Sequence, residues 1–195
     1  MWAGYFARNG IVEQILSYPK DGRDYPVALR HDLIAEIPRL AETYPDYASY
    51  AGQSVDEIFS AEELSQALEL RATVLESTIF WNEEEGFRGE PLPLRAQLAP
   101  IFGIHTADLT GNGREEIVLG GNLYHVKPQS GPYDASRGAV LSYDGERLGS
   151  WHPDNSGVNI NGEIRTIQPF RGADGNQFLL FARYNDTPKV LKLPE

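Results

Sequence analysis

The chain contains no cysteine among its 195 residues. This absence excludes disulfide bonds, thiolate metal sites and a cysteine nucleophile. No apolar run is long enough to cross a bilayer as a helix. Positive charge is also scarce, since 17 Lys and Arg residues face 28 Asp and Glu residues and leave a net charge of −11. Because such a surface repels phosphate groups, we expect no nucleic-acid partner and no anionic lipid partner. The lack of a long apolar run predicts no membrane insertion.

The composition is that of a folded protein rather than a disordered one. Hydrophobic residues make up 41% of the chain and aromatic residues 11%, and this length is enough to bury a substantial core. The opening "MWAGYFARNG" has neither the basic nor the apolar region of a signal peptide. We therefore expect that a chain from an exported protein has lost its leader or is a piece of something longer.

Short segments rich in β-branched and aromatic residues alternate with Asn-Gly and Asp-Gly turns, a pattern typical of antiparallel β proteins. The strands that this pattern predicts are 11–18, 25–30, 69–81, 87–94, 102–108, 116–122, 138–143, 147–152, 162–170, 177–184 and 188–193.

Residues 31–66 interrupt the strands with a helical pattern. Apolar residues recur at spacings of three and four from Leu33 to Tyr44, as on the buried face of a helix. Two Ser-x-x-Glu capping boxes follow, at 54–57 and 60–63. We predict a cluster of short helices inserted between strands.

Grouping the hairpins gives sets of four, four and three strands, and four-stranded units in series are typical of propeller blades. The predicted fold is therefore mainly β, a partial β-propeller of about three four-stranded antiparallel blades of which the last is incomplete. The first predicted blade covers 1–94 and includes the helical insertion at 31–66. The second covers 95–155, and an incomplete third covers 156–195. Three blades do not close a ring, so we expect a fragment or edges covered by another element.

The segment 108–116, "DLTGNGREE", carries oxygen-bearing groups at alternate positions. Calcium prefers six to eight such hard ligands. We predict one calcium ion in this loop, with weakened affinity because two of the expected acids are neutral. The predicted ligands are Asp108, Thr110, Asn112, the backbone carbonyl of Arg114, and Glu116. The alternative is a polar hairpin turn in which Asp108 accepts hydrogen bonds from backbone N–H groups.

An EF-hand is excluded, because its twelfth position requires a bidentate Glu between two helices. That position is Leu119, inside a predicted strand.

The loop has a partial copy near the start of the chain. Aligning "YFARNGIVEQIL" (5–16) with "DLTGNGREEIVL" (108–119) superposes the Asn-Gly pair and the Glu three residues after the Gly. Tyr5 stands where the second copy has Asp108, and Ala7 where it has Thr110. We expect this first loop to hold no metal.

The loop and its following strand, "DLTGNGREEIVLGGN", resemble the calcium-binding repeats of the FG-GAP/VCBS family. The resemblance extends over "LPLRAQLAPIFGIHTAD", "GPYDASRGAVL" and "SGVNINGEIRTI". Residues 9–40 resemble the preceding blade and its helical insertion, so the similarity covers nearly the whole chain. It implies an integrin-α-like β-propeller, here the C-terminal portion of a large exported bacterial protein at the cell surface or in the periplasm. It also implies calcium at the five loop positions.

Three functional hypotheses follow. The first is a non-catalytic, calcium-stabilised scaffold that binds or adheres to a protein or glycan through its inter-blade loops. The second is a glycan-acting enzyme, for which Glu83, Glu84, Glu85 and Trp81 are the candidates, although consecutive hairpin residues diverge. The third is an assembly piece that self-associates or completes a propeller with blades of another chain.

Overall fold

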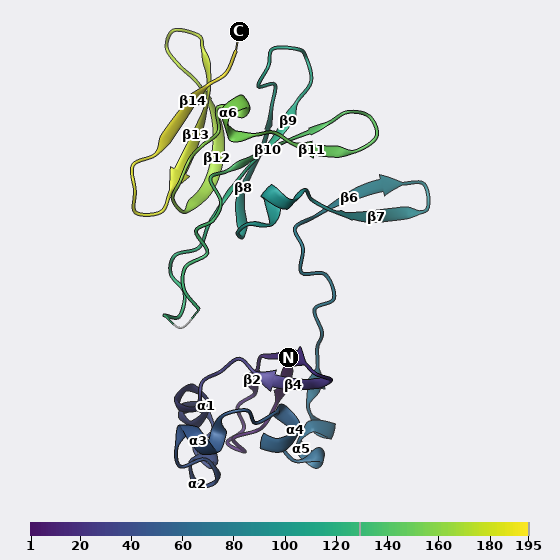
Figure 1. Cartoon of the computed structure of the whole chain (residues 1–195), viewed down its shortest axis with the longest axis vertical. Helices are drawn as coiled ribbons and strands as arrows, with labels where there is room; N and C mark the ends of the chain where they lie inside the picture. The colour runs from purple at the N-terminus through teal and green to yellow at the C-terminus, as the bar shows by residue number, and fades with distance from the viewer. Residues whose placement is uncertain (129, 195) are drawn as a thin grey trace. The chain divides into compact units, whose positions relative to one another are not determined.

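The computed structural model describes residues 1–128 and 130–194 and is mainly β, with several small antiparallel sheets (Figure 1). This confirms the prediction of a mainly β, antiparallel fold. The chain divides into two compact units, Met1–Val74 and Leu75–Glu195, and each has hydrophobic clusters of its own. Within the described residues no helix is long and apolar enough to cross a membrane.

The first unit contains two small antiparallel sheets. One has the strand order β2-β1-β5, and the other is the hairpin β3-β4. Their bounds are β1 Trp2–Gly4, β2 Glu13–Ile15, β3 Ser17–Lys20, β4 Arg23–Pro26 and β5 Leu68–Glu69. The hairpin turns at Asp21-Gly22, where the sequence predicts it.

Five short helices occupy the predicted helical region. They are α1 Arg30–Glu36, α2 Leu40–Thr43, α3 Tyr47–Tyr50, α4 Val55–Ile58 and α5 Ala61–Gln66. At the start of α5, Ser60 and Glu63 cap each other, with N···O distances of 3.2 and 3.0 Å. At the start of α4, the Glu57 carboxylate accepts from the Ser54 N–H at 2.9 Å. Such caps define short helices whose propensity alone would not hold them.

The helices bury their apolar faces against strands of the two small sheets of the first unit. Phe6 lies in the loop between β1 and β2, and its ring centroid is 4.4 Å from that of Phe59. Both rings are fully buried. The core of this unit consists of Phe6, Ile15, Leu33, Ile37, Leu40, Tyr44, Val55, Ile58 and Phe59.

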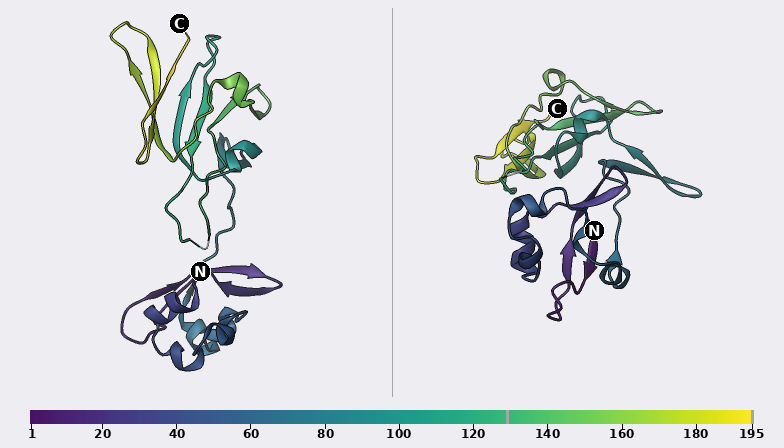
Figure 2. Two further views of the ribbon diagram at one scale, coloured as in Figure 1. Left: turned by 60° about the vertical axis from the view of Figure 1, so that its left-hand side comes forward. Right: turned by 60° about the horizontal axis from the view of Figure 1, so that its bottom comes forward.

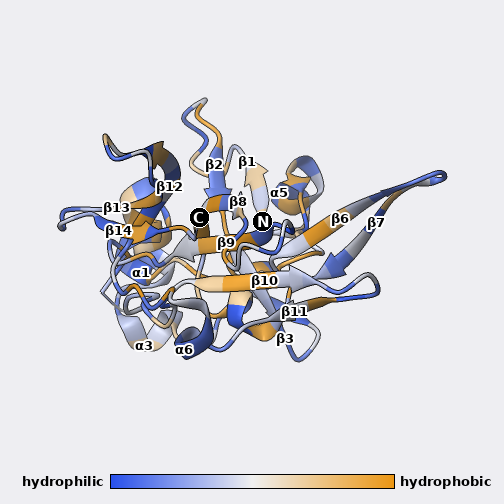
Figure 3. Cartoon of the chain, turned by 90° about the horizontal axis from the view of Figure 1, so that it is seen from above, coloured by the Kyte–Doolittle hydropathy of each residue, from blue (hydrophilic) through white to orange (hydrophobic). Residues whose placement is uncertain are grey.

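The second unit packs two antiparallel sheets against each other, of strand orders β11-β10-β9-β8 and β12-β13-β14. Figure 2 shows the teal-to-green sheet beside the yellow one, and Figure 3 shows hydrophobic residues along β9 and β10. The elements are β8 Ile101–Ala107, β9 Glu116–Gly121, β10 Ala139–Tyr143, β11 Leu148–Ser150, α6 Pro153–Ser156, β12 Ile164–Arg171, β13 Gln177–Arg183 and β14 Lys189–Lys192.

Glycines let β8 and β9 come close to neighbouring backbone. A Cβ on Gly103 would lie 3.2 Å from the backbone nitrogen of Ile167 on β12, and one on Gly120 would lie 2.6 Å from the Ile164 side chain. Gly103 and Gly120 therefore let the two sheets approach each other at this seam. Within the first sheet, a Cβ on Gly121 would lie 1.8 Å from the carbonyl oxygen of Pro100, directly before β8.

A further hairpin, β6 Thr78–Glu83 with β7 Gly86–Pro91, belongs to the second unit and leads to the 3₁₀ helix η1, Leu94–Gln97. One face of this hairpin packs through Trp81, whose ring centroid is 5.1 Å from that of Tyr143. The other face exposes Phe80 and Phe87, at 60% and 73%.

The first predicted blade does not form a single four-stranded sheet, so that part of the prediction is wrong. The strands found between 11 and 94 belong instead to three sheets, β2-β1-β5, β3-β4 and β6-β7, which lie in two units. The predicted strand 69–81 splits, because 70–77 has no paired strand and its Val74 and Leu75 are exposed. β-branched composition favours a strand, but only a hydrogen-bonded partner makes one.

The strand predictions from residue 102 onward agree with the structure. The strands predicted between 102 and 152 form one antiparallel sheet, and those between 162 and 193 form another. Over residues 1–128 and 130–194 the sheets do not form a closed ring. The propeller and its boundaries after residues 94 and 155 stay predictions.

Replacing Gly121 with Ala tests the close approach of β9 to the Pro100 carbonyl. The new methyl would collide with backbone rather than with a flexible side chain, so we expect the free energy of unfolding to fall by about 3 kcal/mol in urea denaturation. Gly149→Ala on β11 is the matched control, since its Cβ would meet no atom within 4 Å, and it should change stability by less than about 0.5 kcal/mol. Equal stability of the two variants would contradict the packing described.

Candidate functional site

The predicted calcium loop connects β8 to β9. Ala107 and Glu116 form the pair that closes the hairpin, and Asp108 follows directly after β8. Thr110, Asn112 and Arg114 lie in the turn, whereas Glu116 is the first residue of β9 and is 3% exposed. The five predicted positions are thus two residues at the strand ends and three in the turn between them.

The Asp108 carboxylate organises the turn. Its Oδ1 accepts hydrogen bonds from the backbone N–H groups of Thr110 and Gly111, at 3.1 and 2.7 Å, and from that of Asn112 at 3.2 Å. Its Oδ2 accepts from the N–H of Gly113 at 2.7 Å. The carboxylate therefore satisfies turn donors that have no partner in a strand ladder.

These bonds favour the ionised acid. The hydrogen bond from the Gly113 N–H, supported by those from the other turn residues against a desolvation cost, lowers the pKa of Asp108 below its usual range.

Two further side chains hold the loop. The Asn112 Oδ1 accepts from the backbone N–H of Arg114 at 2.8 Å. The buried Glu116 reaches back across the hairpin, and its Oε2 accepts from the N–H of Leu109 at 2.9 Å. Gly113 has a φ of +82°, a conformation that a side chain would strain.

The donor set fits a hard cation, although it is poor in charge. Asp108 Oδ2 accepts a single backbone N–H, and a carboxylate oxygen with one such bond keeps a lone pair for a cation. Only two of the five predicted ligands are carboxylates. Within the described residues no group of three or more His, Cys, Asp or Glu side chains lies close enough together to hold a metal ion. The hydrogen bonds alone also describe a polar hairpin turn, so calcium stays a prediction.

A hollow of about 660 Å³ opens beside the loop, in the second unit. Asp108 and Glu115 line one side of it, and His105 of β8 and Gln177 of β13 contribute polar groups. Its lining is completed by Thr106, Ala107, Gly111, Gly113, Pro169, Leu193 and Pro194.

The loop between β1 and β2 has a closely similar internal geometry. Gly4 and Glu13 close it as Ala107 and Glu116 close the later loop. Glu13 is likewise buried, at 6% exposure, and its Oε2 accepts from the N–H of Ala7 at 2.9 Å.

The turn residues of the two loops also correspond. The Asn9 Oδ1 accepts from the N–H of Ile11 at 2.9 Å, as Asn112 does from Arg114. Gly10 has a φ of +83° against +82° for its counterpart, and Arg8 also has a positive φ, of 56°. The alignment therefore superposes the Asn acceptor, the positive-φ Gly and the buried Glu of the two loops, although the N–H that Glu13 accepts lies one position later in the loop than the one that Glu116 accepts.

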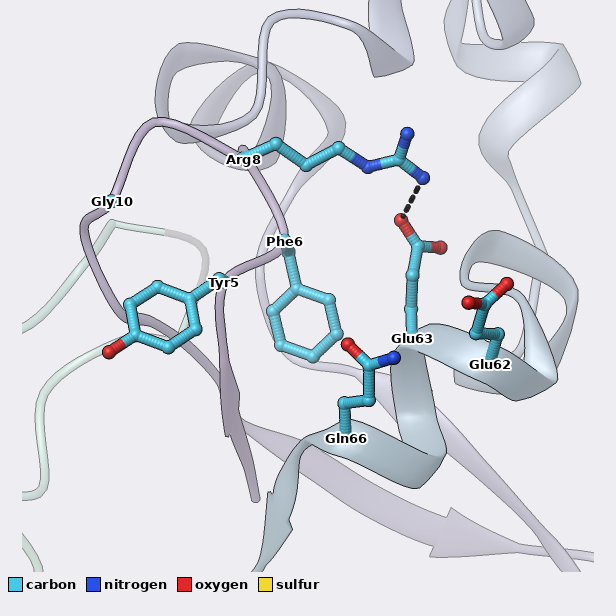
Figure 4. A pocket seen from close by; sticks show the side chains of 7 residues that line it. All are labelled: Tyr5, Phe6, Arg8, Gly10, Glu62, Glu63 and Gln66. Atoms are coloured by element: carbon cyan, nitrogen blue, oxygen red, sulfur yellow. Dashed lines mark hydrogen bonds and ion pairs between the residues drawn. The ribbon is translucent and has the colours of Figure 1, made fainter.

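The first loop lines a hollow of its own, of about 500 Å³ (Figure 4). Tyr5 and Phe6 come from the loop, and Glu62, Glu63 and Gln66 come from α5. Figure 4 shows Arg8 reaching over the hollow to Glu63, at 3.1 Å.

Arg39 binds the same Glu63 oxygen at 2.6 Å. The Glu63 carboxylate is therefore paired with two arginines and also accepts a hydrogen bond at the start of α5. The hollow thus presents no free pair of carboxylates to a cation.

A further polar cluster surrounds Glu163, and no sequence motif predicted it. This carboxylate is fully buried and pairs with Arg165 at the start of β12. Its signal in the sequence is an acid directly before the alternating strand "IRTIQPF", but the loop that covers it is distant along the chain.

Comparisons with protein-family models, with curated proteins and with solved structures each found no match to this chain. The FG-GAP/VCBS likeness therefore stays an expectation from the residues quoted above.

The low pKa of Asp108 predicts a pH dependence. Because its folded pKa lies below the unfolded value of about 3.9, its stabilisation is complete above that value and is lost as the pH falls through the folded pKa. Asp108→Asn should flatten the fall in melting temperature between about pH 5 and pH 2. Thr110→Val, which keeps the backbone donor, should leave the fall intact. Parallel curves for wild type and Asp108→Asn would contradict this role.

Proposed function

We propose that this chain is a non-catalytic, calcium-stabilised segment of a β-propeller of the FG-GAP/VCBS type. It serves as a binding or adhesion scaffold for a protein or glycan, as part of an exported bacterial protein at the cell surface or in the periplasm. The calcium ion occupies the 108–116 loop and orders it.

One observation carries the calcium proposal. The first loop reaches the same turn with Tyr5 where the second has Asp108, and keeps the buried Glu, the Asn acceptor and the positive-φ Gly. A carboxylate at this position is therefore not required by the turn itself. Its presence at 108, with Thr110 in place of Ala7, adds oxygen ligands where a cation would use them.

The residues that would hold calcium are Asp108, Thr110, Asn112, Glu116 and the carbonyl of Arg114. A bound ion would neutralise the two carboxylates and tie the end of β8 to the start of β9. Calcium affinity rises with the number of charged ligands, so two acids favour a modest affinity. The ion's role would be structural, leaving partner binding to the surface loops.

The propeller assignment draws on the second unit. Its four-stranded and three-stranded antiparallel sheets follow each other along the chain and pack face to face through β8, β9 and β12. Successive antiparallel sheets of this size are the building units of propellers. A closed ring would need further blades.

The catalytic alternative gains no support from the hairpin that carries its candidates. Arg88 pairs with Glu83 at 2.6 Å and with Glu90 at 3.1 Å. Consecutive residues of a hairpin also point to opposite faces, whereas the two carboxyl groups of a glycosidase must face each other across one bond.

The assembly alternative has one observation in its favour. Phe80 and Phe87 are exposed on the same face of β6-β7, because Phe80 pairs with Gly89 and Phe87 with Asn82. A two-stranded hairpin with an apolar face is typical of surfaces that a further element covers.

Calcium should raise the melting temperature of the chain above its value in chelator. At a concentration about 100 times the dissociation constant, binding adds about 2.7 kcal/mol, which corresponds to a shift on the order of 5 °C for a protein of this size. Differential scanning fluorimetry measures the shift, and Asp108→Ala should abolish it. An unchanged melting temperature at millimolar calcium would refute the stabilising role.

Asn112→Ala and Asn9→Ala form a matched pair for the same proposal. Each removes one side-chain acceptor from an equivalent turn, so both should lower stability by about 1 kcal/mol. Only Asn112→Ala should also weaken calcium binding, by about tenfold in isothermal titration calorimetry. Equal loss of calcium affinity in both variants would contradict the assignment of the ion to the second loop.

A further inference from the structure

The buried Glu163 lies beneath a group of exposed rings in the second unit. A buried carboxylate is costly unless it is paired and hydrogen-bonded. Arg165 pairs with it, and the backbone N–H of Tyr124 donates to its Oε2 at 3.3 Å. The Nδ1 of His125 lies 3.7 Å from the same oxygen. Glu163 thus ties the loop after β9 to the start of β12.

Arg165 and His125 connect the buried acid to aromatic rings. The guanidinium of Arg165 lies 4.4 Å from the centroid of the Phe102 ring and 5.8 Å from that of Tyr184. The His125 ring meets the Tyr184 ring edge-on, with centroids 4.9 Å apart. We name Phe102, Tyr124, His125, Arg165 and Tyr184 the aromatic patch.

The rings of the aromatic patch are accessible. Phe102 and Tyr184 are 42% and 51% exposed, and Tyr124 is exposed as well. Single exposed rings are ordinary on protein surfaces. Two exposed rings, those of Phe102 and Tyr184, are joined through one arginine and one histidine and anchored on a buried acid, which indicates a built surface.

The root of the loop that carries Tyr124 and His125 is held firmly. The buried Asn122 donates from Nδ2 to the carbonyl oxygens of Ser136 and Gly162, at 2.8 and 2.9 Å, and its Oδ1 accepts from the Ser136 N–H at 3.0 Å. Leu123 pairs with Tyr133 through two backbone hydrogen bonds of 2.9 Å. A ligand would therefore meet rings that are already positioned, which lowers the entropic cost of binding.

The charges of the patch favour a neutral ligand. Glu163 neutralises Arg165 at close range, and the whole chain carries a net charge of −11 that repels anions. The rings are separated by hydrogen-bonding groups of Arg165 and His125, so the patch alternates apolar faces with polar groups. A sugar ring matches this alternation, because its C–H faces can lie on aromatic rings while its hydroxyls hydrogen-bond at the edge.

We propose that the aromatic patch binds a neutral oligosaccharide. The proposal rests on the scaffold function above and narrows its ligand class to glycan. Phe102 and Tyr184 provide the stacking surfaces, Arg165 and His125 hydrogen-bond the hydroxyls, and Glu163 fixes Arg165 in place.

The experiment is isothermal titration calorimetry of the full chain with neutral hexasaccharides, namely cellohexaose, laminarihexaose, xylohexaose and N-acetylchitohexaose. At least one should bind with a dissociation constant below about 1 mM. Tyr184→Ala should weaken that binding by about tenfold, whereas Tyr184→Phe, which keeps the ring, should change it by less than about twofold. Phe170→Ala is the matched control, because Phe170 is an exposed ring on β12 that stacks on Phe178 outside the patch.

The outcomes separate this inference from the calcium proposal. A calcium-dependent rise in melting temperature without binding of any hexasaccharide at about 10 mM would overturn the glycan site and leave the scaffold standing. Equal weakening by Phe170→Ala and Tyr184→Ala would also overturn it. So would a peptide library that selects a Tyr184-dependent binder while the sugars fail. Unchanged melting temperatures of the variants show that they are folded.

Discussion

A buried glutamate at the first residue of a strand anchors each of the two long hairpin loops. Glu13 and Glu116 both sit opposite the last residue of the preceding strand, and both accept a hydrogen bond from a loop N–H. A loop of this length leaves several backbone donors outside the strand ladder, and buried donors require acceptors. The carboxylate provides one at the base of the loop, so the turn above it adopts one conformation.

The two loops differ in what they add to that shared frame. The first places Tyr5, Phe6 and Arg8 against helix α5, where Phe6 joins the core and Arg8 pairs with Glu63. The second places Asp108 where its oxygens collect turn N–H groups and face a hollow beside β13. One frame therefore supports hydrophobic packing in one unit and an acidic, oxygen-rich turn in the other. The proposed calcium role follows from this divergence.

Local features of the sequence predicted the second unit well. Its strands are short, alternate regularly and meet at Asn-Gly and Asp-Gly turns, so each pairs with its neighbour along the chain. The helices between 30 and 66 were predictable for the same reason, since their spacing and caps are local signals.

The first predicted blade failed because its pairing is not local. β1 is too short to show a pattern, yet it pairs with both β2 and β5. Residues 70–77 have strand composition without a strand partner.

The candidate sites divide in the same way. The oxygen-bearing residues of 108–116 lie close together in the sequence, so the sequence predicts them as a group, and the structure adds which backbone groups Asp108 already binds. The aromatic patch could not be found in this way, because Phe102, Tyr124 and Arg165 come from separate strands and loops. The proposed propeller would need blades beyond the described sheets to close, and no local pattern in this chain predicts them.

We propose that calcium binds the second loop and not the first. Amide NMR spectra of the ¹⁵N-labelled chain during a calcium titration distinguish the two loops, since the first loop is an internal control of similar geometry. We expect the amide signals of 108–116 to shift with calcium while those of 5–13 stay in place. No shift in 108–116 at millimolar calcium, or equal shifts in both loops, would contradict it.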